Sequence, residues 1–187
     1  MNAAVNQEPY ALSGVRILLV EEFPFMVALM TSMLREFGVG QVMSTDNVQH
    51  AKRLLVDHNG GHRNTKMIDI LMTDLMGPSR AGVELVQWAR SHKKDTVKYL
   101  PILFASAYTS LEVVEGARDA GVNEILMKPV SAEKLAQRLL YIIDRPRPFV
   151  KAPGFFGPDR RRKVEEFKGE EKRIRSTEDL TVVNEEE

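Results

Sequence analysis

The sequence contains no cysteine, so disulfide bonds, cysteine-ligated zinc, iron–sulfur clusters and thiol catalysis are all excluded. Neither sign of charge is in excess, because 26 Lys and Arg balance 26 Asp and Glu. This balance argues against a dedicated nucleic-acid-binding protein, which usually carries a basic excess. No Gly-x-Gly-x-x-Gly run follows an apolar segment, so a dinucleotide-binding domain has no sequence support.

Long apolar runs are also missing. No stretch approaches the ~18 consecutive apolar residues that a transmembrane helix needs. Residues 1–10 contain neither the basic region nor the apolar region of a signal peptide. We therefore expect no membrane span and a cytoplasmic location.

What the chain does contain is a repeated alternation of two patterns. Its 187 residues, 43% of them hydrophobic, are enough for one domain with a sizeable core. Five short apolar segments are each followed by a stretch with helical spacing of apolar residues. This alternation predicts an α/β fold with a (βα)5 doubly wound, five-stranded parallel sheet. The predicted strands are 15–20, 41–44, 67–73, 101–105 and 123–127, and the predicted helices are about 26–37, 46–58, 80–91, 111–120 and 132–143.

The composition changes near residue 145. We divide the chain into an N-terminal extension (1–13), the α/β domain (14–144) and a C-terminal tail (145–187). Four of the nine prolines lie in 145–158, and the whole tail carries eleven basic and ten acidic residues. Such a composition forms a core poorly, so we expect a mostly irregular tail. It contains no apolar pattern large enough for a helix-turn-helix, so no DNA-binding domain is expected.

The tail also contains an aromatic pair, Phe155 and Phe156, shortly before the basic run 160–163. Three interpretations remain open. The segment is a solvated extension, a docking motif with two aromatic anchors, or a binding site for an anion, RNA or anionic lipid.

Polar residues stand where the predicted strands end. Glu21 and Glu22 follow the first strand, Asp74 the third, Ser106 the fourth and Lys128 the fifth. Parallel strands end at the same edge of a sheet, so we expect these side chains to converge. Neighbouring carboxylates repel one another unless a cation neutralises them, and Mg²⁺ prefers such oxygen ligands. Carboxylates, Mg²⁺, a lysine and a hydroxyl together are suited to phosphoryl transfer, in which an aspartate can be the acceptor.

Four motifs in this order resemble the receiver domain of two-component response regulators. They are the acidic pair 21–22, the segment from Asp74 to Pro78 with Gly82 eight residues on, the strand ending at Ser106, and Lys128 with Pro129. The spacings of 32 residues from Asp74 to Ser106 and 22 from Ser106 to Lys128 are close to those of the family. The resemblance covers about residues 15–144 and implies a flavodoxin-like receiver fold.

The resemblance also implies a role for each residue. Asp74 would be the phosphoacceptor, Ser106 would contact a phosphoryl oxygen, and Lys128 would pair with Asp74 and then with the phosphoryl group. Mg²⁺ would bind the side chains of Glu22 and Asp74 and the backbone carbonyl of Met76. Glu21 would complete the acidic pocket.

Two positions depart from the family pattern. The second acidic position, normally aspartate, is Glu22, and its extra methylene must be accommodated in a metal site with strict geometry. The position three before the lysine, usually aromatic, is Ile125.

The functional hypothesis is a stand-alone, chemotaxis-type response regulator in a phosphorelay, not an enzyme beyond self-phosphorylation and self-dephosphorylation. It would receive its phosphoryl group from a histidine kinase or a histidine phosphotransfer protein. Output would be contact with a downstream protein through the surface of helix 111–120, strand 123–127 and helix 132–143, or through the tail. One alternative is a phosphorylation-independent pseudo-receiver that acts through its tail, and a weaker one is a phosphate sink.

Overall fold

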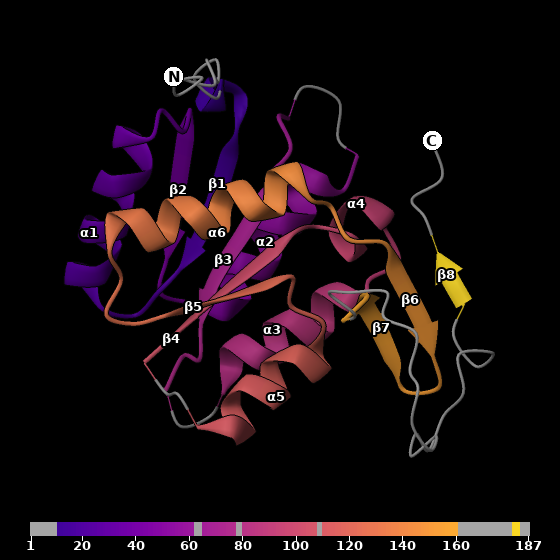
Figure 1. Cartoon of the computed structure of the whole chain (residues 1–187). Helices are drawn as coiled ribbons and strands as arrows, with labels where there is room; N and C mark the ends of the chain where they lie inside the picture. Colours follow the sequence, from indigo (N-terminus) through magenta and orange to yellow (C-terminus); the bar gives the residue numbers. More distant parts are fainter. Residues whose placement is uncertain (1–10, 62–64, 78–79, 108–109, 161–180, 184–187) are drawn as a thin grey trace, which may run out of the picture.

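The computed structural model describes residues 11–61, 65–77, 80–107, 110–160 and 181–183. A five-stranded parallel sheet has the order β2-β1-β3-β4-β5 (Figure 1). This order places β3 at the centre of the sheet, between β1 and β4, and confirms the predicted doubly wound topology. The strands are β1 Arg16–Val20, β2 Gln41–Thr45, β3 Ile70–Asp74, β4 Ile102–Ser106 and β5 Glu124–Met127.

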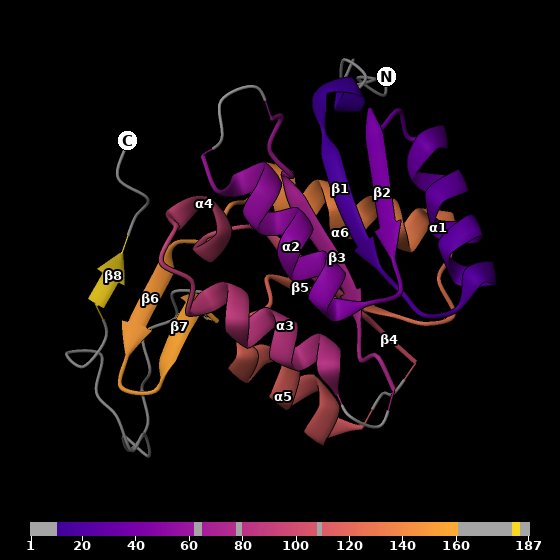
Figure 2. The same ribbon diagram turned by 180° about the vertical axis from the view of Figure 1, so that it is seen from behind.

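Helices cover both faces of the sheet. Helices α1 and α6 contribute Leu34, Leu139 and neighbouring apolar residues to one core layer. Helices α2, α3 and α5 pack on the other face, where Leu55, Leu85 and Ala117 are buried (Figures 1 and 2). The helices are α1 Pro24–Glu36, α2 Val48–Asn59, α3 Ala81–Arg90, α4 Asp95–Lys98, α5 Leu111–Ala120 and α6 Ala132–Asp144, with a 3-10 turn at Leu12–Gly14.

The third strand begins later than the sequence pattern predicts, at Ile70 instead of Met67. In the preceding backbone, the N–H of Asp69 still donates to the carbonyl of Arg16 in β1 at 2.9 Å, whereas Ile68 is held by a side chain. The amide of Asn59 donates to the carbonyl of Ile68 at 2.8 Å and accepts from the N–H of Ile68 at 3.0 Å. The one-turn helix α4, which the sequence did not predict, lies between α3 and β4.

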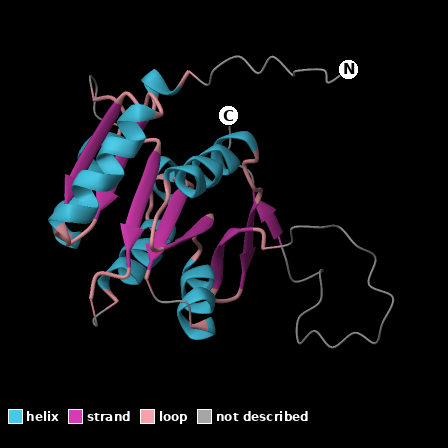
Figure 3. Cartoon of the chain, turned by 60° about the vertical axis from the view of Figure 1, so that its left-hand side comes forward, coloured by secondary structure: helices cyan, strands magenta, loops and turns pink. Residues whose placement is uncertain are grey.

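The expectation of a mostly irregular tail is wrong for the segment that directly follows α6. Strands β6 (Phe149–Ala152) and β7 (Phe155–Pro158) form an antiparallel hairpin, and β8 (Thr181–Val183) pairs with the other side of β6 (Figure 3). The apolar side chains of Phe149 and Val150 are buried. Proline at 158 is compatible with this strand because it lies at the end of β7, at the edge of the sheet.

The hairpin packs on the amino ends of β4 and β5, the sheet edge opposite Asp74. The ring of Tyr99 lies 4.9 Å from that of Phe149 and 5.3 Å from that of Phe156, both edge-on. Gly157 lies so close to Gly121 that a Cβ atom at 157 would meet the Cα of Gly121 at 2.8 Å. The aromatic pair 155–156 is therefore part of a packed sheet, which contradicts its interpretation as a free linear docking motif.

A buried arginine joins this hairpin to the α/β domain. The guanidinium of Arg90 donates to the carbonyls of Lys98, Leu100 and Gly121 at 2.7–2.8 Å, and to the side chain of Asn123. It also lies over the ring of Phe149 at 5.0 Å. Burial lowers the pKa of Arg90 to about 9, so the guanidinium remains charged at neutral pH and its hydrogen bonds are charge-assisted.

Within the described ranges, no helix has both the length and the apolar character to cross a membrane.

Candidate functional site

The predicted polar residues do meet at the carboxyl edge of the sheet. Asp74 and Ser106 are the last residues of β3 and β4, and Glu21 and Lys128 directly follow β1 and β5. The register pairs Asp74 with Ala105, so Ser106 lies one residue beyond the level of Asp74 on the next strand. Parallel pairing of strands far apart in sequence thus brings the side chains together.

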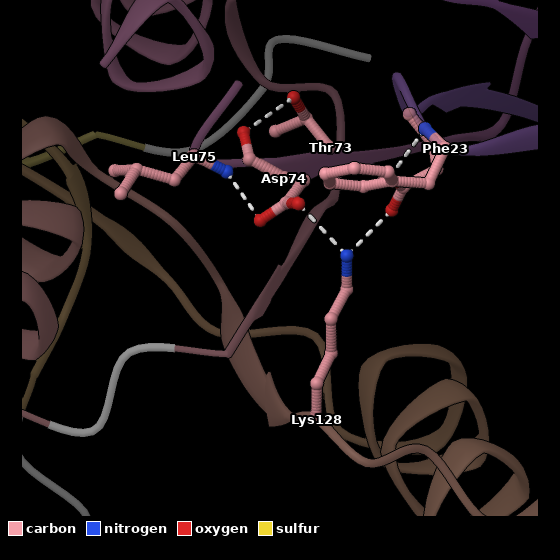
Figure 4. A network of polar contacts seen from close by, with 6 residues as sticks. Phe23, Thr73, Asp74, Leu75 and Lys128 are labelled. Carbon is pink, nitrogen blue, oxygen red and sulfur yellow. Dashed lines mark hydrogen bonds and ion pairs between the residues drawn. The ribbon is translucent and has the colours of Figure 1, made fainter. Parts of the chain in front are cut away.

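Lys128 connects two of the carboxylates. Its Nζ atom lies 2.6 Å from Oε2 of Glu21 and 2.7 Å from Oδ2 of Asp74 (Figure 4). The side chains are 9% exposed for Lys128, 1% for Glu21 and 11% for Asp74. All three ions are largely removed from water, so their attraction is poorly screened.

The electrostatics of this group keep the lysine charged. Burial by itself lowers the pKa of Lys128, but hydrogen bonds and charge attraction from Asp74 and Glu21 outweigh it and raise the pKa above its ordinary 10.5. Two carboxylates and one ammonium leave one negative charge uncompensated within the group. The site therefore attracts one more cation.

The remaining acceptor oxygen of Asp74 is held by the backbone. The N–H of Leu75 donates to Oδ1 at 2.5 Å, so Lys128 and Leu75 fix the two carboxylate oxygens from different sides (Figure 4). The hydroxyl of Thr73 donates to the carbonyl of Asp74 at 3.2 Å. A sequence cannot reveal the Leu75 contact, because every residue except proline offers a backbone N–H.

Gly82, which follows Asp74 by eight residues in the predicted motif, is explained by a close approach. A Cβ atom at this position would overlap the backbone carbonyl oxygen of Asp74. The N–H of Gly82 also donates to the carbonyl of Leu75 at 3.1 Å. The first turn of α3 thus lies directly against the end of β3, and only glycine allows this distance.

The predicted metal ligands are less closely grouped. Glu22 is exposed, and its Oε2 atom faces Gly77, 3.9 Å from where a Cβ of that residue would be. Met76, 8% exposed, has a positive φ of 59°. Across the described ranges, no three acidic or imidazole side chains converge as a metal-binding cluster. The structure thus brings Glu21 and Asp74 together through Lys128, while the side chain of Glu22 is exposed to solvent beside this buried group.

Ser106 and Lys128 are joined through the backbone. Ser106 is 1% exposed, and its carbonyl accepts from the N–H of Lys128 at 2.8 Å. The peptide bond between Lys128 and Pro129 is cis.

The family model described as "Response regulator receiver domain" matches residues 17–140 of this chain. The chain belongs to this family. Among curated relatives, the chemotaxis protein CheY of Pseudomonas aeruginosa is 28% identical over 131 residues, which cover 70% of this chain and 98% of that protein. Chemotaxis protein CheY-3 of Vibrio cholerae is also 28% identical, over 71% of this chain and 94% of its own length.

Solved structures agree with this assignment. A putative response regulator from Chloroflexus aurantiacus has a TM-score of 0.61 at 24% identity, over 70% of this chain and 98% of its own. The receiver domain of a sensor histidine kinase from Pseudomonas aeruginosa, solved with a magnesium ion in its active-site cleft, has a TM-score of 0.57 at 26% identity. That match covers 68% of this chain and 95% of the receiver domain.

The chain is therefore a CheY-like receiver domain of two-component signalling, followed by a segment outside the family match. Receiver domains are phosphoacceptor signalling modules, so a role as phosphoacceptor is favoured over that of a pseudo-receiver. The predicted fold class and family are confirmed.

Proposed function

We propose that Asp74 is the phosphoacceptor and that its donor is a phosphohistidine on a sensor kinase or a phosphotransfer protein. The observation that carries this assignment is the placement of the Asp74 carboxylate, held by Lys128 on one oxygen and by the Leu75 N–H on the other. A carboxylate fixed in this way meets its reaction partner without a search over rotamers. Lys128 is also in reach of any phosphoryl group attached to Asp74.

In the proposed step, a carboxylate oxygen of Asp74 attacks the phosphorus while the bond from phosphorus to the imidazole nitrogen breaks. The electron pair of that bond returns to the imidazole, and an acyl phosphate forms. Lys128 exchanges its contact with the carboxylate for one with the phosphoryl oxygens, and it keeps its proton because Glu21 remains beside it. The Ser106 hydroxyl is proposed to contact a phosphoryl oxygen.

Mg²⁺ fits the donor set of this edge, because Glu22, Asp74 and the carbonyl of Met76 offer oxygen ligands and the buried group has an excess negative charge. Bound there, the ion would neutralise charge on the transferred phosphoryl group. We assign Glu21 to the acidic pocket, where its bond to Lys128 and its acceptance from the Phe23 N–H at 3.1 Å hold it in place.

For output, we propose protein contact through the surface of α5, β5 and α6, since Lys128 directly follows β5. We propose the unit 14–144 as the receiver proper, with the hairpin as a folded addition to it. The cytoplasmic location stays a prediction.

The test is incubation with a small-molecule phosphodonor and Mg²⁺, followed by intact-mass measurement. We expect a phosphate-sized gain in the wild type and none in Asp74→Asn. Asp57→Asn, an exposed aspartate on α2, is the control and should gain the phosphate normally. Absence of a gain in folded wild-type protein would favour the pseudo-receiver instead.

A further inference from the structure

A groove that has no part in the proposed phosphotransfer lies along β5, at the edge of the parallel sheet. Its volume is about 520 Å³, within the range of ~300–1,000 Å³ that is usual for small-ligand sites. Helices α5 and α6 and the end of the C-terminal hairpin complete its lining, which includes the apolar side chains of Val114, Ile125 and Met127. The groove therefore has the size and the mixed lining of a site for a small molecule.

The polar part of this lining is dominated by arginine. Two carboxylates pair with these arginines, Glu124 within the groove and Asp119 beside it. Four guanidinium groups thus meet two carboxylates, which leaves a positive excess of two charges. This excess predicts an anionic ligand with more than one negative charge. The arginines are Arg118 of α5, Arg138 of α6, and Arg147 and Arg160 of the segment after α6.

Glu124 fixes two of the arginines. Its side chain, 1% exposed, accepts from Arg138 at 3.0 Å and from Arg147 at 2.6 Å. The guanidinium of Arg147 also lies over the ring of Tyr141 at 5.6 Å. A guanidinium has several N–H donors, so Arg138 and Arg147 keep further donors after binding Glu124. Because these side chains are already held in place, a ligand would bind them with little loss of side-chain entropy.

Arg160 and Arg118 form the other half of the charged lining. Arg160 pairs with Asp119 at 2.7 Å, and its guanidinium lies over the ring of Phe155 at 4.4 Å. It also donates to the backbone carbonyl of Arg118 at 3.2 Å, so the two residues are neighbours in space. Arg118 is exposed, and its own guanidinium makes no hydrogen bond or ion pair with the part of the chain that the structure describes. Its charge is available to a ligand without the loss of an existing contact.

Part of the groove lies beyond the receiver family match. That match ends at residue 140, whereas Arg147, Pro158 and Arg160 follow it. The hairpin is held against the end of α5, because a Cβ atom at Gly157 would meet the Cα of Gly121 at 2.8 Å. The groove therefore depends on a folded segment that the receiver family model does not include.

We propose that this groove binds a small organic polyphosphate of the nucleoside polyphosphate class, with its phosphates on the arginines and its organic part over Val114 and Ile125. Guanidinium groups match the oxygens of phosphate in paired hydrogen bonds, and a polyphosphate supplies the several negative charges that the excess requires. The apolar lining gives the organic part a surface to cover. The proposal is independent of the phosphoacceptor assignment, because neither Asp74 nor Lys128 lines the groove.

The experiment titrates the full chain with ATP by isothermal titration calorimetry, without added Mg²⁺ so that metal-dependent chemistry at Asp74 does not contribute. Adenosine, which lacks phosphate, and inorganic tripolyphosphate, which lacks the organic part, are the comparison ligands. We expect ATP to bind with a dissociation constant in the micromolar range. Tripolyphosphate should bind roughly tenfold more weakly and adenosine should not bind.

Variants locate the site. Arg118→Gln should weaken ATP binding by roughly tenfold, because a charge-assisted contact is lost while no contact within the protein is broken. Arg118→Lys keeps the charge and should weaken it less. Arg53→Gln removes the same charge from an exposed position on α2 and should change the affinity by less than about twofold. Phosphorylation of Arg118→Gln by a small-molecule donor, measured by intact mass, should equal that of the wild type.

Three results would overturn the proposal. One is the absence of ATP binding up to about 1 mM in folded protein. Another is equal weakening by Arg118→Gln and Arg53→Gln, which would reduce the attraction to net charge. The third is equal affinity for tripolyphosphate and ATP, which would leave a site for inorganic anions only. Binding of a poly-U RNA that depends on Arg118, with no binding of ATP, would instead assign the groove to nucleic acid.

Discussion

Lys128 and Glu21 lie 107 positions apart in the sequence, yet their side chains meet at 2.6 Å with almost no exposure to solvent. The contact joins the end of β1 to the end of β5, across the two strands β3 and β4 that lie between them. Asp74, from the strand between them, shares the same ammonium group. This single cation holds together the edge at which we propose that phosphotransfer occurs.

Replacing Lys128 with Met should lower the free energy of unfolding by ~3 kcal/mol at neutral pH, because two carboxylates lose their shared counter-charge in a buried site. Urea unfolding followed by circular dichroism measures the change. Lys93→Met, at an exposed position after α3, should change stability by less than ~0.5 kcal/mol. An equal effect of both changes would contradict the role given to Lys128.

The raised pKa of Lys128 predicts a dependence on alkaline pH. A lysine whose pKa is higher in the folded state stabilises the fold fully below its unfolded value of 10.5 and loses that contribution as pH rises above it. Glu21→Gln removes one cause of the raised pKa of Lys128. As the pH rises, the free energy of unfolding of this variant should therefore fall less than that of the wild type. Unfolding between about pH 8 and pH 11 measures this difference, and parallel curves would contradict it.

Gly82→Ala should destabilise the protein by ~1–3 kcal/mol, since the added methyl group overlaps the carbonyl of Asp74 and must displace β3 or α3. Gly116→Ala is the matched control, because a Cβ there meets nothing within 4 Å in the middle of α5. That change should stabilise the helix by about 0.5–1 kcal/mol. Thermal unfolding measures both changes in stability. A loss in Gly82→Ala with a gain in Gly116→Ala would confirm the close approach at Gly82, and changes of the same sign would refute it.

Phe149→Ala tests whether the hairpin belongs to the same cooperative unit as the receiver. The side chain is 7% exposed and contacts Tyr99, Phe156 and Arg90, so its loss should cost ~3 kcal/mol. Phe25→Ala, 75% exposed on α1, should cost less than ~0.5 kcal/mol. We expect one unfolding transition that shifts as a whole; an early separate transition would show that the hairpin unfolds independently.

Glu22→Asp should lower the Mg²⁺ concentration needed for half-maximal phosphorylation by roughly fivefold, or ~1 kcal/mol. The shorter side chain restores the family's usual ligand length at a site where Mg²⁺ requires near-octahedral geometry. Intact mass after a fixed reaction time, over a Mg²⁺ series, gives the value. Glu115→Asp, exposed on α5, is the control, and an unchanged midpoint in Glu22→Asp would argue against Glu22 as a ligand.

The alternation of apolar strands and amphipathic helices was sufficient to predict the receiver architecture. A strand shows as a continuous apolar run or an alternation of period two, and a helix shows as apolar residues with a period of 3.6. Both patterns involve residues close together in the sequence, so they can be recognised without the structure. The polar residues at the strand ends could be placed at one edge for the same reason, since parallel pairing aligns all carboxyl ends. Glu124 shows the limit of that pattern: a charged residue in a buried strand is accommodated by Arg138 and Arg147 from other segments.

Only the tertiary structure decided which of these residues touch and what the tail does. The sequence places Glu21 and Glu22 next to each other after the first strand, but only the structure shows that the Glu21 side chain meets Lys128 while Glu22 is exposed. Proline and charge in the tail predicted little order, yet Phe149 and Phe156 find their burial against Tyr99, a residue 50 positions away from the first of them. Composition reports the average tendency of a segment, whereas its folding depends on the apolar surface that a distant part of the chain offers it.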